Sequence, residues 1–273
     1  MKLTLARFYW PADAIVDPLN FPAVFQSEAG PVSISIIDIP LTHKSIDELL
    51  TPPFHLEKWF HGQGLFLDTL CGVIIDNYYP PDHPDSSKIG RVFSLLSEEL
   101  DVVPVINKND LADAAQWEHF VEQMSVLHEF NQLLGEALST HKIIEFHTRY
   151  KMQFLAHSQP AYRQLGPLVA NIKHESSLYE FAHQYRQHFM RLLRYPATVQ
   201  NHTNVVMHLQ GYFRKKVDDE ARQQLTTLIH QYRLGEISLS EVKTTLRRLQ
   251  AVAPHGWLAQ QRYLYPWFTE YDL

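Results

Sequence analysis

One stretch of the sequence carries several side chains that could together bind a ligand. Residues 198–216, TVQNHTNVVMHLQGYFRKK, have the spacing of an amphipathic helix. Beside its apolar face runs a stripe of polar or small residues: Asn201, Asn204, His208, Gly211 and Lys215. The amides, the imidazole and the ammonium supply hydrogen-bond donors and acceptors, and Gly211 leaves room for a ligand or another backbone to come close. The stripe could equally form hydrogen bonds with a neighbouring helix.

A second stretch, HTRYKMQFLAHSQPAYRQLG, mixes cations and histidines with apolar residues. Lys151 borders the apolar stripe of a predicted helix, from where it could reach a ligand. A new helix is expected to start at the S-Q-P sequence, which places Tyr162 and Arg163 near a helix start, where free backbone N–H groups suit an anion. His157 falls inside the apolar stripe. At such a position a hydrogen-bonded core histidine is more common than a ligand-binding one, and the sequence leaves both roles open.

The first half of the chain offers weaker candidates. Asp76, Asp82, His83 and Asp85 could form a metal site with oxygen and nitrogen ligands, but PPDHPD is more typical of a solvated turn. Cys71, the single cysteine, adjoins the apolar residues GVII, which favours a buried, inert thiol. One thiol cannot hold an iron–sulfur cluster or a structural zinc ion. No P-loop, G-x-S-x-G or H-E-x-x-H motif occurs. We therefore expect no metal and no cofactor.

The elements that must position these residues differ between the two halves. Short apolar runs at 32–39, 71–76 and 101–106 alternate with Pro-rich connectors and an amphipathic stretch, which predicts an α/β pattern with parallel strands. From residue 117 onward helical spacing replaces the strand signals. The prediction is an α+β chain: an N-terminal α/β domain with a small, mostly parallel sheet (1–138) and a C-terminal all-α helical domain (139–273).

Helix ends can be predicted at several points of the second half. Ser177 and Glu180 have the spacing of a capping box, and the helix that they open must stop before Pro196. A later helix is expected to end at Gly235.

Charge is distributed unevenly along the chain. Residues 1–140 hold 7 Lys and Arg against 20 Asp and Glu, whereas residues 141–273 hold 17 against 10. The first part therefore carries −13 and the second +7, which suggests an anionic partner for the basic half: nucleic acid, or the acidic half of the same chain. No apolar run approaches the ~18 residues of a membrane span, and the start lacks the apolar core of a signal peptide. We expect a cytoplasmic protein without membrane contact.

Several segments resemble a known family. HTRYKMQFLAHSQPAYRQLGPLVANI, RYPATVQNHTNVVMHLQGYFRKK, QYRLGEISL and WLAQQRYLYP are similar in order and spacing to the helical domain of the YbgA family, over roughly residues 141–266. In that family the helical domain often follows an α/β domain similar to the thiouracil and thiouridine desulfidases, whose cysteines hold an iron–sulfur cluster that removes sulfur from a thiolated base. Residues 72–106 resemble the second half of such a domain, with GVIIDNYYPPDHP at the place of its S-P-S-C-G motif.

The chain departs from the desulfidase pattern at the cluster ligands. If Pro80 corresponds to the motif proline, Asp82 stands at the cysteine position and His83 at the following glycine. The N-terminal cysteine motifs have no counterpart. Because cluster assembly needs several thiolates, desulfidase activity is not expected.

The resemblance implies a partner of enzymes that act on thiolated RNA bases, and the helical domain is basic with aromatic residues near its cations. We therefore expect it to bind RNA, with tRNA as the favoured class. The candidate binding residues are Lys151, Tyr162, Arg163, Asn201, Asn204, His208, Gly211 and Lys215. One alternative is an enzyme that uses Asn204, His208 and Lys215, or the Asp82–His83 turn, for acid–base or metal chemistry. Another is a structural or regulatory partner without a ligand. The sequence does not predict an oligomeric state.

Overall fold

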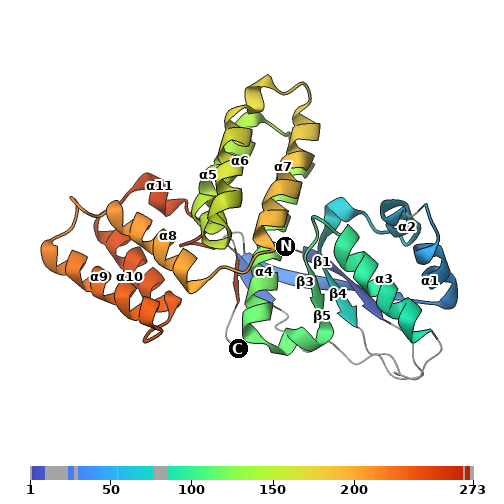
Figure 1. Ribbon diagram of the computed structural model, residues 1–273. Coiled ribbons are helices and arrows are strands. Elements are labelled where there is room, and N and C mark those ends of the chain that lie inside the picture. The colour runs from blue at the N-terminus through green and yellow to red at the C-terminus, as the bar shows by residue number, and fades with distance from the viewer. Residues whose placement is uncertain are drawn as a thin grey trace. The chain divides into compact units, whose positions relative to one another are not determined.

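The chain folds into two compact units. The computed structural model describes residues 2–9, 24–27, 30–53, 55–76, 85–266 and 268–270. The first unit comprises Met1–Glu136 together with Trp267–Leu273, and the second comprises Ala137–Pro266 (Figure 1). Among the described residues, none of the helices combines the length and the apolar composition that a membrane span requires.

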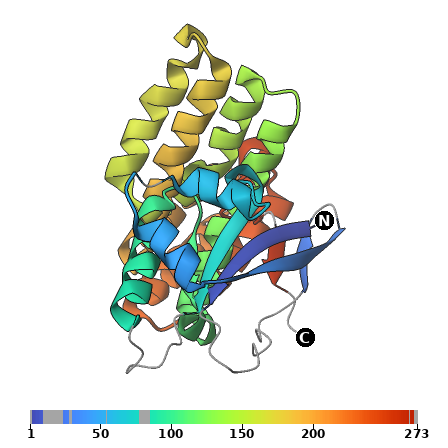
Figure 2. The ribbon, with the colours of Figure 1, turned by 90° about the vertical axis from the view of Figure 1, so that its right-hand side faces the viewer.

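A single sheet forms the centre of the first unit. Six strands of the described residues follow the order β5-β4-β1-β3-β2-β6. β1 pairs in parallel with β3 and β4, and β4 pairs in parallel with β5; Figure 2 shows β1 beside β3. β2 and β6 add antiparallel pairs at one edge. The predicted α+β class with a small, mostly parallel N-terminal sheet is therefore confirmed. The strands are Lys2–Tyr9 (β1), Val24–Ser27 (β2), Gly30–Pro40 (β3), Leu70–Asp76 (β4), Val105–Asn107 (β5) and Phe268–Glu270 (β6).

Two of the observed strands differ from the predicted ones. β1 was not predicted, although its side chains alternate between two buried faces: Leu3 and Leu5 belong to one core cluster, whereas Phe8 contacts the ring of Phe60 on the other face. β5 is shorter than the predicted strand at 101–106. It begins directly after Pro104, which has no N–H to donate to a neighbouring strand and so limits the pairing.

Helices cover both faces of this sheet. They span His43–Leu50 (α1), Leu56–Gly62 (α2), Ser86–Glu99 (α3) and Ala114–Gly135 (α4). α4 packs Phe120 against Leu5 and Cys71, and α2 supplies Phe60 to the opposite face. α4 approaches β4 closely at Gly72, where an added Cβ would lie 2.7 Å from Cζ of Phe120. Glycine at this strand position therefore sets the distance between helix and sheet.

The second unit is helical throughout. The helices span Thr140–His157 (α5), Gln159–Ala170 (α6), Leu178–Leu193 (α7), Val199–Gly211 (α8), Asp219–Leu234 (α9), Leu239–Val252 (α10) and Gly256–Ala259 (α11). Each of the six long helices begins after a residue whose side-chain oxygen accepts a backbone N–H of the first turn, which satisfies a donor that the helix itself cannot. These capping residues are Ser139, Ser158, Ser177, Thr198, Asp218 and Ser238.

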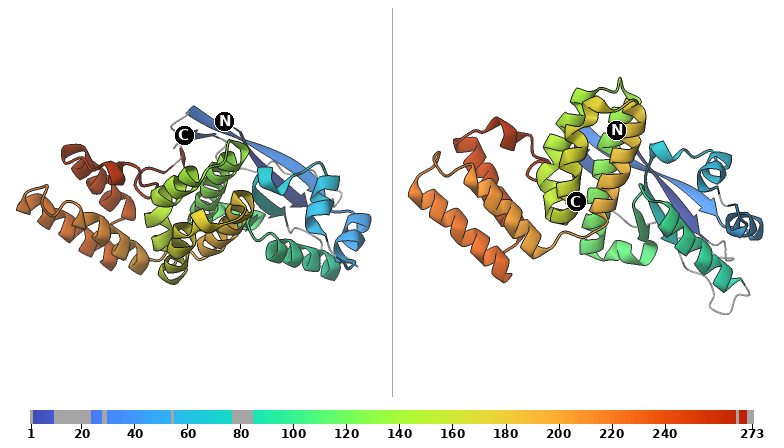
Figure 3. Two further views of the ribbon diagram at one scale, coloured as in Figure 1. Left: turned by 90° about the horizontal axis from the view of Figure 1, so that it is seen from above. Right: turned by 45° about the horizontal axis from the view of Figure 1, so that its top comes forward.

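α5 connects the two groups of helices in this unit. It packs against α6 and α7 on one side and against α8 on the other, and α8, α9 and α10 pack against one another (Figure 3). Leu155 of α5, Leu209 of α8, Ile229 of α9 and Leu246 of α10 belong to one buried cluster. The C-terminal half of α5 and the start of α6 are thereby held beside α8 and α11.

Several predicted helix ends are confirmed and others are not. α7 ends before Pro196, and Gly235 follows α9 with a φ of 77°. The Ser177 hydroxyl accepts the N–H of Glu180, the Ser177 half of the predicted capping box. α8 ends at Gly211, not at 216. β6 pairs with β2, so the helical unit ends before the predicted residue 273.

Candidate functional site

Two adjoining hollows lie at the junction of α5 and α6 in the helical unit. The first, which we call the basic hollow, has a volume of about 430 Å³ and extends between α5, α6 and the 3-10 turn Ile172–His174. The second, the aromatic hollow, has a volume of about 270 Å³ and extends from α5 and α6 to the end of α8 and to α11. Lys151, Tyr162 and Arg163 line both hollows and therefore form the wall that they share.

Three cations surround the basic hollow. Lys151 is half-buried on α5, whereas Arg163 on α6 and Lys173 in the 3-10 turn are exposed. Among the described residues, no acidic side chain lines either hollow. Within residues 85–266, which the structure describes without a gap, none of the three cations forms a salt bridge or a side-chain hydrogen bond. Their charge is therefore available to an anion at this place.

Aromatic rings line the second hollow. Tyr212 and Trp257 stack with their ring centroids 4.9 Å apart and their planes 19° from parallel. Tyr212 is 38% exposed, so part of its ring is open to a ligand. Burial, and then the nearby Tyr212, raise the pKa of Tyr162, so the Tyr162 hydroxyl stays protonated and able to donate. The aromatic hollow thus joins ring faces, a hydroxyl donor and the two shared cations.

A buried histidine forms part of the floor of the basic hollow. Nδ1 of His147 lies 3.0 Å from the hydroxyl of Tyr185, which is fully buried. Burial, and then the charge of Lys151, lower the pKa of His147 to about 4. His147 is therefore neutral at pH 7. Its ring lies parallel to that of Tyr162, with 6.5 Å between their centroids.

Tyr162 and Arg163 do not act through a helix start, as the sequence analysis expected. Pro160 has no N–H, the N–H of Ala161 donates to the Ser158 hydroxyl, and the N–H of Tyr162 donates to the Ser158 carbonyl. These backbone donors near the start of α6 are therefore used within the chain. The two residues contribute their side chains to the hollows instead.

The structure divides the predicted stripe on α8. His208 lines the aromatic hollow, but the other four members line neither hollow. The Asn201 amide donates to the His157 carbonyl at 3.2 Å, which is the helix-packing role that the sequence left open. An added Cβ at Gly211 would meet no described atom within 4 Å, so the close approach of another backbone is not seen there, and the close approach of a ligand stays a prediction. Lys215 lies beyond the end of α8, so its helical position relative to Asn204 was also wrong.

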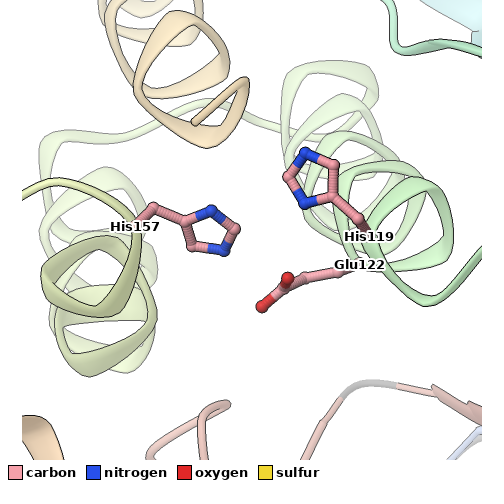
Figure 4. A group of neighbouring side chains, drawn as sticks. All are labelled: His119, Glu122 and His157. Atoms are coloured by element: carbon pink, nitrogen blue, oxygen red, sulfur yellow. The ribbon is translucent and has the colours of Figure 1, made fainter. Parts of the chain in front are cut away.

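His157 is a buried side chain at the end of α5 (Figure 4). It is 3% exposed, and its Nδ1 lies 2.7 Å from the carbonyl oxygen of Tyr195, to which the protonated ring nitrogen donates. His157 lines neither hollow. Of the two roles that the sequence left open, this geometry is that of a hydrogen-bonded core histidine.

In the first unit, the Cys71 thiol and the neighbouring His128 imidazole are held in neutral form. Sγ of Cys71 lies 3.3 Å from Nδ1 of His128. Burial raises the pKa of Cys71 to about 11 and, as the largest cause, lowers the pKa of His128 to about 4. At neutral pH, Cys71 is thus a protonated thiol beside an uncharged imidazole. A protonated thiol is a poor nucleophile. His119 and Glu122 project from α4 (Figure 4).

The predicted carboxylate and histidine turn can be followed only at its two ends. Asp76 is buried at the end of β4 and lies 2.9 Å from Nζ of Lys108. Asp85 precedes α3 and lies 2.9 Å from Nδ1 of His43. Asp82 and His83 lie outside the described residues.

Comparison with known proteins covers the unit that holds the two hollows. Residues 151–267 match a family model described as "Protein of unknown function (DUF1722)". The chain is also 45% identical over 141 residues to "Uncharacterized protein YbgA" of Escherichia coli (strain K12), an alignment that covers 52% of this chain and 83% of that protein. The chain belongs to the YbgA family. No solved structure matches it. The resemblance of residues 72–106 to the desulfidases stays a prediction.

Part of the site was not predicted from the sequence. Lys173, His147 and Tyr212 were not predicted as site residues, and Trp257 was included only within the segment WLAQQRYLYP of the family resemblance. Tyr212 and Trp257 are 45 positions apart, so only the packing of α11 near the end of α8 brings their rings together. A search for aromatic residues near cations in the YbgA-like segments would have found Tyr212, which shortly precedes the cations of residues 214–216, but it would not have shown that Trp257 is its partner.

Proposed function

We propose that the helical unit of this YbgA family member binds RNA, and that the RNA is a tRNA. The charge of the unit supports the broader part of the proposal, because residues 137–266 hold 17 Lys and Arg against 8 Asp and Glu. A surplus of nine positive charges attracts the phosphate backbone of a nucleic acid. The choice of tRNA rests on the resemblance of residues 72–106 to enzymes that act on thiolated RNA bases.

One observation carries the proposal. The cations Lys151 and Arg163, which form no salt bridge within residues 85–266, stand in the same wall as Tyr162 and beside the Tyr212–Trp257 stack. Phosphates are bound by cations, whereas bases are bound by aromatic faces, so proteins that bind flexible RNA combine the two in one groove. A phosphate-binding site alone would not need the exposed part of the Tyr212 ring.

The test is direct binding of RNA to the full chain. Fluorescently labelled tRNA should raise its anisotropy on addition of the protein, and the affinity should fall steeply as the salt concentration increases, because phosphate contacts release counterions. Lys151→Ala and Arg163→Ala should each reduce the slope of log affinity against log salt by about one.

Arg248→Ala is the matched control. Arg248 is an exposed cation on α10 that lines neither hollow. Its removal should weaken binding less than either hollow variant does. If the full chain does not bind RNA at low salt, the proposal fails, and a structural or regulatory role becomes the better account.

The geometry does not favour the acid–base alternative on α8. Asn204 and Lys215 line neither hollow, and His208 is exposed at the rim of the aromatic one. General acid–base catalysis requires its groups within hydrogen-bond reach of one reacting atom. The three residues are not gathered in one hollow, so we do not propose this enzyme.

A further inference from the structure

We infer that the two hollows select unpaired nucleotides, with one base stacked in the aromatic hollow and the neighbouring nucleotide in the basic hollow. This inference rests on the proposed RNA binding and specifies its substrate class as single-stranded segments, such as loops and strand ends. Three features of the helical unit lead to it: the size of the aromatic hollow, the position of its rings and the cations in the shared wall.

The aromatic hollow suits a single base. Its volume of about 270 Å³ is slightly below the ~300–1,000 Å³ that is typical of sites for drug-sized ligands. Inside a duplex, both faces of each base are covered by the bases above and below. A base can therefore enter this hollow and contact the Tyr212 ring only if it is splayed out of a stack.

The shared wall suits the phosphate that follows or precedes this base. Lys151 and Arg163 line both hollows, so a phosphate beside them can link a base on one side of Tyr162 to a nucleotide on the other. Lys173 adds a third cation to the lining of the basic hollow, where the next phosphate of the strand can bind. The basic hollow, at about 430 Å³, is the larger of the two and can take a nucleotide.

A duplex meets neither requirement. Proteins recognise double-stranded RNA mostly by contacts that span many base pairs of a regular surface, not by pockets that admit one base. The cations at the rim would still attract a duplex through its phosphates, but the ring faces would contribute nothing. The difference between the affinities for single-stranded and duplex RNA therefore measures how much base stacking in the aromatic hollow contributes to binding.

The experiment compares a labelled single-stranded RNA of about 12 nucleotides with the same strand annealed to its complement, using the full chain at low salt. A 12-nucleotide strand covers the ~4–16 nucleotides that single-strand binding folds occupy. We expect the single strand to bind about tenfold tighter than the duplex. Tyr212→Leu should weaken single-strand binding about tenfold and leave duplex binding unchanged, because base stacking on one ring contributes about this much. Tyr212→Phe, which retains the ring face, should restore the affinity that Tyr212→Leu loses.

Two further measurements separate a binding role from a structural one. Stacking of a base near Trp257 should quench part of the tryptophan fluorescence on addition of the single strand, and this part should be lost in Trp257→Phe. A mixture of free nucleoside monophosphates, at the same nucleotide concentration, should compete poorly, since it cannot occupy both hollows through one linked strand.

The outcomes are distinguishable. Equal affinity for single strand and duplex, or a Tyr212→Leu variant that binds the single strand as the wild type does, would overturn the inference while RNA binding itself stands. Competition by monophosphates as strong as by the oligonucleotide would show a mononucleotide site instead. Absence of binding to both RNA forms would remove the proposed function as well.

Discussion

The buried His147 makes the helical unit sensitive to acid, and the size of this effect follows from its surroundings. The ring is 7% exposed and lies 3.0 Å from the Tyr185 hydroxyl, and its pKa falls from about 6.5 to about 4 through burial and the charge of Lys151. Because the unfolded chain takes up a proton at higher pH than the folded chain does, the free energy of unfolding falls as the pH drops from 6.5 to 4. This difference between the pKa values of the folded and unfolded chains corresponds to about 3 kcal/mol in the free energy of unfolding once the pH is below both values.

The measurement is the pH dependence of urea unfolding for the wild type and for His147→Gln, which cannot be protonated in this range but can still form a hydrogen bond with Tyr185. Between pH 7.5 and 4.5, the free energy of unfolding of the wild type should fall by about 2–3 kcal/mol more than that of the variant. His174→Gln is the control: its ring is exposed, so water surrounds it in both states, and the variant should follow the wild type. If the wild type and His147→Gln lose stability in parallel, His147 is not the neutral, buried group described above.

Three further predictions concern the two cores. The protein should stay colourless when it is purified anaerobically with iron and sulfide, since a single thiol with a pKa of about 11 cannot hold a cluster; a stoichiometric iron–sulfur absorption band would contradict this. His157→Ala should lower the free energy of unfolding by about 1–3 kcal/mol, because the Tyr195 carbonyl loses its donor, whereas the exposed Lys215→Ala should change it by less than about 0.5 kcal/mol; equal effects would refute the core role. Gly72→Ala should cost about 1–3 kcal/mol in urea unfolding through its clash with Phe120, and an unchanged midpoint would show that α4 can shift.

Local patterns in the sequence predicted much of the fold. β3 and β4 follow apolar runs, and α9 ends at Gly235, because strand burial and helix termination depend on residues that are close together in the chain. β1 was missed because a central parallel strand is buried on both faces. Its sequence therefore lacks the regular alternation of apolar and polar side chains that marks a strand with one exposed face. The antiparallel pairing of β6 with β2 joins segments about 240 residues apart, for which no local signal exists.

The site was predicted only in part, for a related reason. Four of the predicted residues line one hollow, because they lie close to the turn between α5 and α6 and to α8. They are Lys151, Tyr162, Arg163 and His208. The helical wheel placed Lys215 on the same stripe because it assumed that the helix continues, but α8 ends at Gly211. A wheel describes one helix face and does not show which side of it a neighbouring helix covers, so the hydrogen bond from Asn201 to the His157 carbonyl could not be foreseen.

The most direct test of the account is the salt dependence of RNA binding by the full chain carrying both Lys151→Ala and Arg163→Ala, measured beside the wild type and Arg248→Ala. The account predicts that the double variant reduces the slope of log affinity against log salt by about two, whereas Arg248→Ala leaves it within about half a unit of the wild type. A double variant whose slope equals that of the wild type would contradict it, because the RNA would then bind elsewhere than at the two hollows.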